Sequence, residues 1–266
     1  MACTVGVHQG RGGMGDVAGN LAAVQEQARR AHSAGIDLLV FPELYATGYN
    51  LGQQFHALAE PVHGAIGERL QRIAAASGVA LICGYPERCD GRIYNAAMVV
   101  DGRGRRLGNY RKTHLYGPVE RSVFAAGDAW LVIELCGLRV GVLICYDIEF
   151  VEPARALALT GVDLLAVPTA LTASARAVAR RIAPARAQEN QVYLAYANHC
   201  GEEHGLRYAG ESCIIGPNGE DLARAQAQPA LISAEVDPNV IAHERETVDY
   251  LRDRRPGLYT ALGREE

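Results

Sequence analysis

Short apolar segments rich in β-branched residues alternate along this chain with segments of helical periodicity. An apolar run at residues 4–7 is followed by an amphipathic pattern at 20–33 and by a second apolar run at 36–41. The short runs are typical of buried strands, and the longer pattern places apolar side chains on one face of a helix. Strands that alternate with helices favour a layered α/β fold.

The same alternation continues towards the C-terminus. Further helices are predicted at 66–77, 152–159 and 175–189, and further strands at 79–83, 94–100, 131–134, 139–144, 163–167, 192–197, 211–215 and 231–236. A glycine turn at 216–219 is predicted between the last two strands. No linker rich in Gly, Pro or Ser interrupts the series, so residues 1–266 are predicted to form a single domain.

Two segments far apart in the sequence are similar. Residues 35–42 read GIDLLVFP, and residues 161–168 read GVDLLAVP. Each follows a predicted helix, and each ends in a proline where a strand ends. The repeat suggests two related layers that meet face to face, with corresponding loops opening on one side. Coincidence between two α/β strand patterns is the alternative.

Charge and cysteine usage exclude several classes of protein. The formal net charge is -4 without a basic stripe, so neither a nucleic acid nor a membrane surface is an expected partner. No apolar run is long enough to span a bilayer, and the first residues do not read as a signal peptide. Seven cysteines without C-x-x-C spacing predict free thiols in a reducing cytoplasm, and they predict no metal site.

A G-x-G-x-x-G motif at residues 10–15 stands between a predicted strand and a predicted helix, where a dinucleotide-binding fingerprint belongs. The acidic residue that should bind the ribose is missing at the end of the second strand, because Glu43 comes too late and follows a proline. The motif is therefore interpreted as a loop, with Asp16 or Asn20 capping the next helix.

Three segments each place a reactive side chain just after an apolar strand. The first is LLVFPEL at residues 38–44, in which Glu43 follows a buried type of strand and a proline. Partial burial raises the pKa of a carboxylic acid and suits it to general-base catalysis. The alternative interpretation is an exposed glutamate in a loop.

The second segment is YRKTHLYGPVER at residues 110–121, which contains Lys112. This residue is the only lysine among the 26 lysine and arginine residues of the chain. A lysine beside buried carboxylates can stabilise a substrate oxygen as a compact charge. A solvated lysine in a loop is the alternative, but a chain this rich in arginine would be expected to use arginine on its surface.

The third segment is RVGVLICYDIEF at residues 139–150. Cys145 stands where an apolar strand gives way to a helix, so its Sγ is expected to be exposed beside free backbone N–H groups that can bind an oxyanion. A buried structural cysteine is the alternative. His114 lies near Lys112 in the sequence and is an alternative base for the thiol.

Together these segments resemble the nitrilase superfamily of carbon–nitrogen hydrolases and, within it, the small-amide amidases of the R-stereoselective type. FPEL carries the glutamate of that family, YRKTHL its lysine and GVLICYDIEF its cysteine. Similar pieces are TGYN after Glu43, VFAAGD at 123–128, PARAQENQVYLAYAN at 184–198 and RRPGLY near the C-terminus. The resemblance thus covers essentially the whole chain, and Val151 departs from it where the family often has proline.

The resemblance implies a four-layer α-β-β-α sandwich with internal pseudo-symmetry, which would explain the repeated segment. It implies the catalytic residues Glu43, Lys112, Cys145 and Glu120, with no metal and no cofactor. Asp147 is expected to cap the following helix. The substrate-binding residues are predicted to be Tyr146, Tyr49, Tyr116, Glu149 and Ala170. A homodimer or higher homo-oligomer is expected, with the C-terminal tail at about 240–266 in its contacts.

The predicted activity is hydrolysis of a small primary amide to a carboxylic acid and ammonia through a cysteine thioester. Glu43 would act as base, and Lys112 with the backbone N–H of Tyr146 would stabilise the oxyanion. The alternatives are a nitrilase or an N-carbamoyl amide hydrolase on the same scaffold, or a non-catalytic binding protein of this fold. Glu149 stands where related enzymes for acidic amides carry arginine, so neutral or basic amides are predicted. A solvent-facing Glu149 would select nothing.

Overall fold

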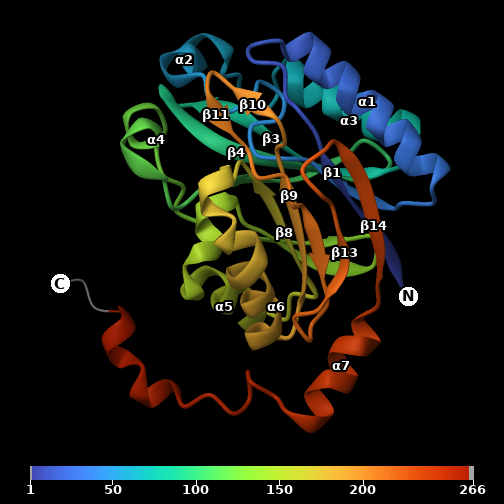
Figure 1. The fold of residues 1–266 in the computed structure, drawn as a ribbon, viewed down its shortest axis with the longest axis vertical. Helices are drawn as coiled ribbons and strands as arrows, with labels where there is room; N and C mark the ends of the chain where they lie inside the picture. Colours follow the sequence, from blue (N-terminus) through green and yellow to red (C-terminus); the bar gives the residue numbers. More distant parts are fainter. Residues whose placement is uncertain (1, 264–266) are drawn as a thin grey trace.

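The computed structural model describes residues 2–263, and within this range two six-stranded sheets pack face to face. Helices α1 (Val17–Ser33) and α3 (Ala65–Ser77) pack together on the first sheet, whereas α5 (Val151–Leu159) and α6 (Ala183–Asn190) cover the second (Figure 1). This arrangement confirms the predicted α-β-β-α sandwich.

The first sheet has the strand order β14-β1-β2-β3-β4-β5. Its members are β14 (Ala230–Val236), β1 (Cys3–Gln9), β2 (Leu38–Val40), β3 (Ala80–Cys89), β4 (Arg92–Val100) and β5 (Arg106–Arg111). Strands β1, β2 and β3 run parallel, and the others pair antiparallel. The carboxyl ends of the three parallel strands therefore meet at one edge of this sheet.

The second sheet has the order β13-β12-β9-β8-β7-β6. Its members are β13 (Asp221–Arg224), β12 (Cys213–Ile215), β9 (Tyr193–Asn198), β8 (Leu164–Thr169), β7 (Leu138–Val142) and β6 (Leu131–Leu135). Strands β7, β8 and β9 run parallel. Each sheet thus contains three neighbouring parallel strands, and contacts of β2 and β3 with β8 bring these strands together at the centre.

Both faces of the central strands are buried, which explains their continuous apolar sequences. Side chains such as Val5, Val7, Val140 and Val142 fill the space between the sheets, and all four are fully buried. Outside the first sheet, helix α1 buries Leu21, Val24, Ala28 and Ala31. Close packing on both sides holds the strand ends rigidly, and the loops that follow them inherit that position.

The repeated segments belong to two equivalent βαβ units, one in each of the two facing sheets, which agrees with the two related layers that the repeat suggested. Val5 pairs with Leu38 in the first unit, and Val140 pairs with Leu164 in the second. In the first unit the Asp37 side chain accepts the backbone N–H of Thr4 at 2.8 Å. In the second unit the side chain of Asp163 accepts the N–H of Arg139, also at 2.8 Å. The same contact thus joins the two strands of each unit.

The glycine-rich loop at 10–15 leads into α1, whose first turn is capped by Asp16. The Asp16 carboxylate accepts the N–H of Gly19 at 2.9 Å, which confirms the capping interpretation. Asn20, the other candidate, instead accepts the N–H of Gly13 from within the helix. The helix begins at Val17, one turn earlier than its apolar pattern suggested.

The helix predicted at 175–189 is interrupted. The chain forms a 3-10 turn at Ala173–Ala175 and a π-helical turn at Val178–Ile182 before α6 begins at Ala183. Pro184 has no N–H to donate and its ring crowds the preceding turn, so a regular α-helix cannot continue through it. The N–H of Ala183 accordingly reaches the carbonyl of Val178, five residues earlier.

Several short elements carry too little periodicity to be predicted. They are helices α2 (Phe55–Leu58), α4 (Gly117–Val123) and α7 (Pro238–Thr247), the strands β10 (Glu202–Glu203), β11 (Leu206–Arg207) and β13, and 3-10 turns at Gly52–Gln54, Cys145–Glu149, Pro256–Leu258 and Thr260–Gly263. The turn at 216–219 therefore joins β12 to β13 rather than to the last strand. Residues 264–266 of the predicted oligomer tail lie outside the described residues, and no described helix could cross a membrane.

Candidate active site

The predicted reactive residues gather at the carboxyl ends of the parallel strands. Glu43 follows β2, Cys145 follows β7 and Ala170 follows β8. The N–H of Glu43 donates to the carbonyl of Thr169 at 3.3 Å, which joins the loops of the two sheets. In open α/β sheets this is the edge at which ligands bind.

Lys112 lies at the centre of this cluster and is fully buried. Its Nζ is 2.7 Å from Oε1 of Glu43 and lies 2.8 and 2.9 Å from the two carboxylate oxygens of Glu120. Burial by itself lowers the pKa of Lys112, but the two carboxylates outweigh burial and hold that pKa above its ordinary value. The site therefore contains a permanent cation between two acids.

Glu43 is fully buried, and its two carboxylate oxygens differ. Oε1 accepts hydrogen bonds from Lys112 and from the side-chain amide of Asn95, each at 2.7 Å. Oε2 is buried without a hydrogen-bond partner among residues 2–263. Burial raises the pKa of Glu43, although Lys112 opposes the effect. One oxygen is thus fixed while the other is free to take a proton.

Cys145 is the first residue of the 3-10 turn that follows β7, and its φ is 47°. A left-handed conformation at a residue other than glycine is strained and is common at functional sites. Burial first, and then the charge of Glu43, raise the pKa of the Cys145 thiol. The resting sulfur is therefore a neutral thiol that needs a base to become a nucleophile.

A cavity of about 140 Å³ opens at Cys145. Of the predicted substrate-binding residues, it is lined by Tyr49, Tyr116, Glu149 and Ala170; its remaining walls are Leu171, Thr172, Ala175 and Leu206. The side chain of Tyr146 does not line it, because its ring packs edge-on against Tyr116 and Phe150 with centroids 5.2 and 4.9 Å away. The structure thus brings four of those five residues to the thiol.

Glu120 comes from helix α4, and three groups hold its carboxylate. Besides Lys112, it accepts the hydroxyl of Tyr49 at 2.7 Å and the backbone N–H of Tyr116 at 2.8 Å. Both tyrosines also line the cavity at Cys145. Glu120 therefore connects the buried lysine to the cavity wall.

Asp147 does not cap helix α5, so that prediction was wrong. The residue is fully buried, and its carboxylate accepts the N–H groups of Ile144 and His114 and the hydroxyls of Tyr110 and Thr113. These donors come from both sides of the site, and they pin the turn at Cys145 to the segment after Lys112. Sequence spacing cannot reveal such a contact between distant segments.

His114, the alternative base, is directed elsewhere. Its Nδ1 lies 2.9 Å from Asp147, and its ring stacks on Phe150 with centroids 4.3 Å apart. None of the hydrogen bonds found for its ring within residues 2–263 involves Cys145. The geometry therefore favours Glu43 over His114 as the partner of the thiol.

Four buried residues at the site were not predicted from the sequence: Asn95, Thr169, His199 and Glu203. Asn95 bonds to Glu43, and His199 contacts the backbone carbonyl of Glu43 at 2.6 Å. Only Asn95 and Thr169 had a signal that could have found them, since each is a polar residue within a strongly apolar strand.

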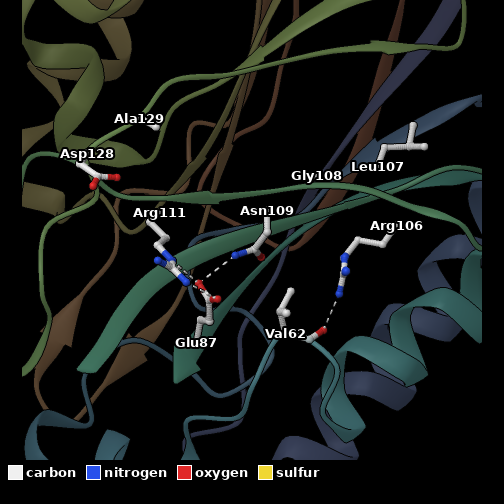
Figure 2. Close-up of a pocket in the computed structure, with 9 residues that line it drawn as sticks. All are labelled: Val62, Glu87, Arg106, Leu107, Gly108, Asn109, Arg111, Asp128 and Ala129. Atoms are coloured by element: carbon white, nitrogen blue, oxygen red, sulfur yellow. Dashed lines mark hydrogen bonds and ion pairs between the residues drawn. The ribbon is translucent and has the colours of Figure 1, made fainter. Parts of the chain in front are cut away.

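A wider hollow of about 470 Å³ lies over β5, and the carboxylate of Glu87 in its wall is held by neighbouring side chains (Figure 2). Arg111 binds the carboxylate of Glu87 through two nitrogens at 2.7 and 2.8 Å, and the side chain of Asn109 donates to the same carboxylate. The residues that line this hollow include no cysteine. The smaller cavity at Cys145 is therefore the candidate active site.

Several known proteins are similar to this chain. The family model described as carbon-nitrogen hydrolase matches residues 4–246. A "Hydrolase in pqqF 5'region" of Pseudomonas protegens is 48% identical over 94% of this chain and 88% of its own. An (R)-stereoselective amidase of Pseudomonas sp is 39% identical over 91% of this chain and 87% of its own.

Solved structures of an amidase from Nesterenkonia sp. AN1, a member of the nitrilase superfamily, have the same fold. A cysteine mutant of it has a TM-score of 0.89 and 34% identity, covering 98% of this chain and 97% of that one. In another mutant, with a TM-score of 0.89 and 34% identity over 97% of this chain and 96% of that one, the active-site cysteine carries the acetamide moiety of fluoroacetamide. A further cysteine mutant is in complex with butyramide, at a TM-score of 0.86 and 34% identity over 97% and 96% of the two chains.

Proposed function

Because this chain belongs to the carbon–nitrogen hydrolase family and is an amidase-type hydrolase of the nitrilase superfamily, we propose that it cleaves a small primary amide to a carboxylic acid and ammonia through a cysteine thioester. The observation that carries the proposal is the geometry at Glu43: one carboxylate oxygen is fixed by Lys112 and Asn95, and the other is buried without a hydrogen-bond partner among residues 2–263. An unpaired acceptor beside a neutral thiol has the arrangement of a general base.

The first half of the reaction forms the thioester. Glu43 takes the proton of the Cys145 thiol, and the sulfur attacks the carbonyl carbon of the amide. The oxygen becomes an oxyanion, which the ammonium of Lys112 and the N–H of Tyr146 stabilise. That N–H lies in the first turn of a 3-10 helix, where backbone donors lack partners within the helix. Glu43 then returns its proton to the nitrogen, and ammonia leaves.

The second half hydrolyses the thioester. Glu43 takes a proton from water as the oxygen attacks the carbonyl carbon, and the C–S bond breaks. The proton on Glu43 returns to the sulfur, the acid departs, and the thiol is restored. Two uses of one base explain why Glu43 must be held firmly and kept away from bulk water.

Glu120 is proposed to orient the amide nitrogen and to hold Lys112 in place. Glu120→Gln keeps the shape of this side chain and removes its charge. We expect a large loss of turnover but continued alkylation of Cys145 by chloroacetamide, because Glu43 remains as base. Unchanged turnover would reduce Glu120 to a structural residue of α4.

The proposal is tested by measuring ammonia release across a panel of primary amides, N-carbamoyl compounds and nitriles. Butyramide belongs in the panel because the Nesterenkonia amidase binds it as a cysteine mutant. We expect kcat/KM to be highest for an amide. A preference for nitriles or carbamoyl compounds would favour the alternative activities. If no compound is hydrolysed and Cys145 does not react with alkylating agents either, the chain is a non-catalytic binding protein.

Glu149 is proposed to favour basic over acidic acyl groups. It lines the cavity at Cys145, and its carboxylate makes no hydrogen bond or ion pair within residues 2–263. Burial raises the pKa of Glu149, as expected for a carboxylate partly shielded from water. Lys112 is already bound by Glu43 and Glu120, and Glu149 adds a further carboxylate at the cavity wall, so a substrate carboxylate would be repelled.

The charge preference is tested with three substrates of similar size: butyramide, 3-aminopropanamide and succinamate. We expect 3-aminopropanamide to be favoured over succinamate, and Glu149→Gln to reduce that ratio of kcat/KM at least tenfold. Glu152→Gln, which removes an exposed carboxylate from α5, is the matched control. Equal ratios in wild type and Glu149→Gln would show that Glu149 selects nothing.

A homodimer formed through α5 and the C-terminal tail is also proposed. Val151 and Leu159 on α5 and Leu258 in the tail are apolar and 45, 49 and 65% exposed. Light scattering on the whole chain and on a chain ending at residue 247 tests this, with the shorter chain expected to be monomeric. A reducing cytoplasm is the proposed compartment, since all seven cysteines are free thiols.

A further inference from the structure

Two buried polar residues behind the site, His199 and Glu203, have no part in the mechanism above. His199 follows β9, is fully buried, and places Nε2 2.6 Å from the carbonyl oxygen of Glu43. A carbonyl oxygen can only accept, so Nε2 carries a proton and donates it. Burial lowers the pKa of His199, which keeps the ring neutral and leaves a lone pair on Nδ1.

Glu203 holds the opposite side of the site. Its Oε2 accepts the backbone N–H groups of Tyr49 and Asn50 at 3.0 and 2.8 Å and the hydroxyl of Tyr208 at 2.8 Å. Tyr49 in turn donates its own hydroxyl to Glu120. Glu203 therefore fixes the backbone of the residue that orients Glu120.

The two residues also face each other. Nδ1 of His199 lies 4.0 Å from Oε1 of Glu203, and both atoms are buried without a hydrogen-bond partner among residues 2–263. This separation is too long for a hydrogen bond, and the charge of Glu203 partly opposes the lowering of the His199 pKa by burial. Glu203 thus lies against the ring nitrogen that faces away from Glu43, while the other nitrogen donates to the Glu43 carbonyl.

We propose that His199 and Glu203 are positioning residues that fix the separation of the Glu43 and Glu120 carboxylates around Lys112. The inference rests on the proposed function, because it concerns the carboxylates that function uses. Glu43 needs such support because the next residue, Leu44, has a strained φ of 51°. On its N-terminal side the backbone of Glu43 is already held, since its N–H donates to the carbonyl of Thr169. Without His199 the carbonyl of Glu43 would lose its partner inside the protein.

The test compares substitutions at His199 with one at a second buried histidine. His199→Phe keeps the ring and removes the donor, whereas His199→Gln keeps a donor at the position of Nε2. His8→Phe is the matched control, because His8 is also buried but bonds to Tyr45 and not to Glu43. Misplacing a reacting group by about 1 Å costs about 100-fold in rate, so His199→Phe should lose about that much in kcat.

We expect the KM of His199→Phe for butyramide to stay within threefold, and His199→Gln to recover most of kcat. His8→Phe should keep kcat per active site, counted by complete labelling of Cys145 with chloroacetamide. Glu203→Gln, which can donate to His199 and still accept from Tyr49, should keep kcat within about fivefold, whereas Glu203→Ala should not.

Equal losses in His199→Phe and His8→Phe would overturn the inference, as would equal losses in His199→Phe and His199→Gln. The rate of Cys145 alkylation gives a reading that does not need turnover: it should fall in His199→Phe and stay unchanged in His8→Phe. If wild type hydrolyses no amide, the proposed function fails, and the alkylation rates still decide whether His199 and Glu203 position the base.

Discussion

The two βαβ units at residues 3–43 and 138–170 are built alike and end differently. In each, an aspartate after the helix accepts a backbone N–H from the first strand, and a glycine with positive φ precedes it. Their pairing registers make Gly10 equivalent to Cys145 and Glu43 equivalent to Thr169. The first unit thus contributes an acid after its second strand, and the second unit contributes a thiol after its first.

The difference shows how one scaffold provides unlike reactive groups. A side chain at Gly10 would collide with the ring of His8, so the first unit has no room for a nucleophile at that position. Thr169 is buried and neutral, so the second unit adds no acid beside Glu43. Face-to-face packing then brings one reactive residue from each unit to the same edge of the sandwich. Symmetry thus provides the position, and asymmetric substitution provides the chemistry.

The largest effect is expected at the thiol of the second unit. Cys145→Ala should remove all measurable ammonia release and leave the far-ultraviolet circular dichroism unchanged, because no other group can form the thioester. Cys213→Ala, at a fully buried cysteine of β12, is the control and should stay within a few-fold of wild type. Substantial turnover by Cys145→Ala would show that the nucleophile lies elsewhere.

The next effect concerns the equivalent residues Glu43 and Thr169. Glu43→Gln should lower kcat/KM by about a thousandfold or more, because an amide cannot take the thiol proton. Thr169→Val replaces the hydroxyl with a methyl group of similar size and should lower kcat/KM less than tenfold. Steady-state kinetics on butyramide measure both variants. Losses of equal size would mean that the two units share the proton transfer, which contradicts the asymmetry described above.

Lys112, which belongs to neither unit, should be nearly as sensitive as Glu43. Lys112→Arg should fail almost as badly as Lys112→Ala, since a planar guanidinium cannot replace a compact ammonium enclosed by two carboxylates. Arg111→Lys is the matched control: it alters the neighbouring cation, which binds Glu87 in the hollow of Figure 2, and should keep turnover. A Lys112→Arg variant with near wild-type kcat would place the lysine outside the reaction.

The smallest effect is expected for the two aspartates that the units have in common, and it tests whether the units are structurally equivalent. Asp37→Ala and Asp163→Ala each remove one hydrogen bond between the two strands of a unit. Each should lower the free energy of unfolding by about 1 kcal/mol and leave kcat per active site unchanged. Urea denaturation measures the change. A much larger loss of unfolding free energy for one aspartate would mean that the two hydrogen bonds do not stabilise the two units equally.

The layered fold was predictable because its evidence is local. Continuous apolar strands, the amphipathic helix that ends at residue 33 and the duplicated GIDLLVFP segment each depend on neighbouring residues. The interruption before α6 depends on Pro184, but its form as a π-helical turn was not predictable. Short elements such as α4 and β10 were missed because tertiary contacts, and not periodicity, stabilise them.

The sequence by itself determined the reactive side chains and the strand ends from which they come. Glu43 and Cys145 each follow an apolar strand, whereas Lys112 follows the polar, partly buried β5, and strands in a sandwich must end at one of two edges. The strands themselves can be recognised locally, because a strand that is buried on both faces has a continuous run of apolar residues in the sequence. Glu120 and the residues of the cavity came instead from resemblance to a family.

Only the tertiary structure decided how these side chains are held. Glu43 contacts Lys112, 69 residues later, and His199, 156 residues later, and Glu203 contacts Tyr49 across 154 residues. No periodicity connects positions so far apart, because their separation in space is set by the packing of two sheets. The same packing places Asp147 across the site and leaves one oxygen of Glu43 without a partner among the described residues. Residue types therefore set which reactions are possible, and long-range packing sets which atom is free to react.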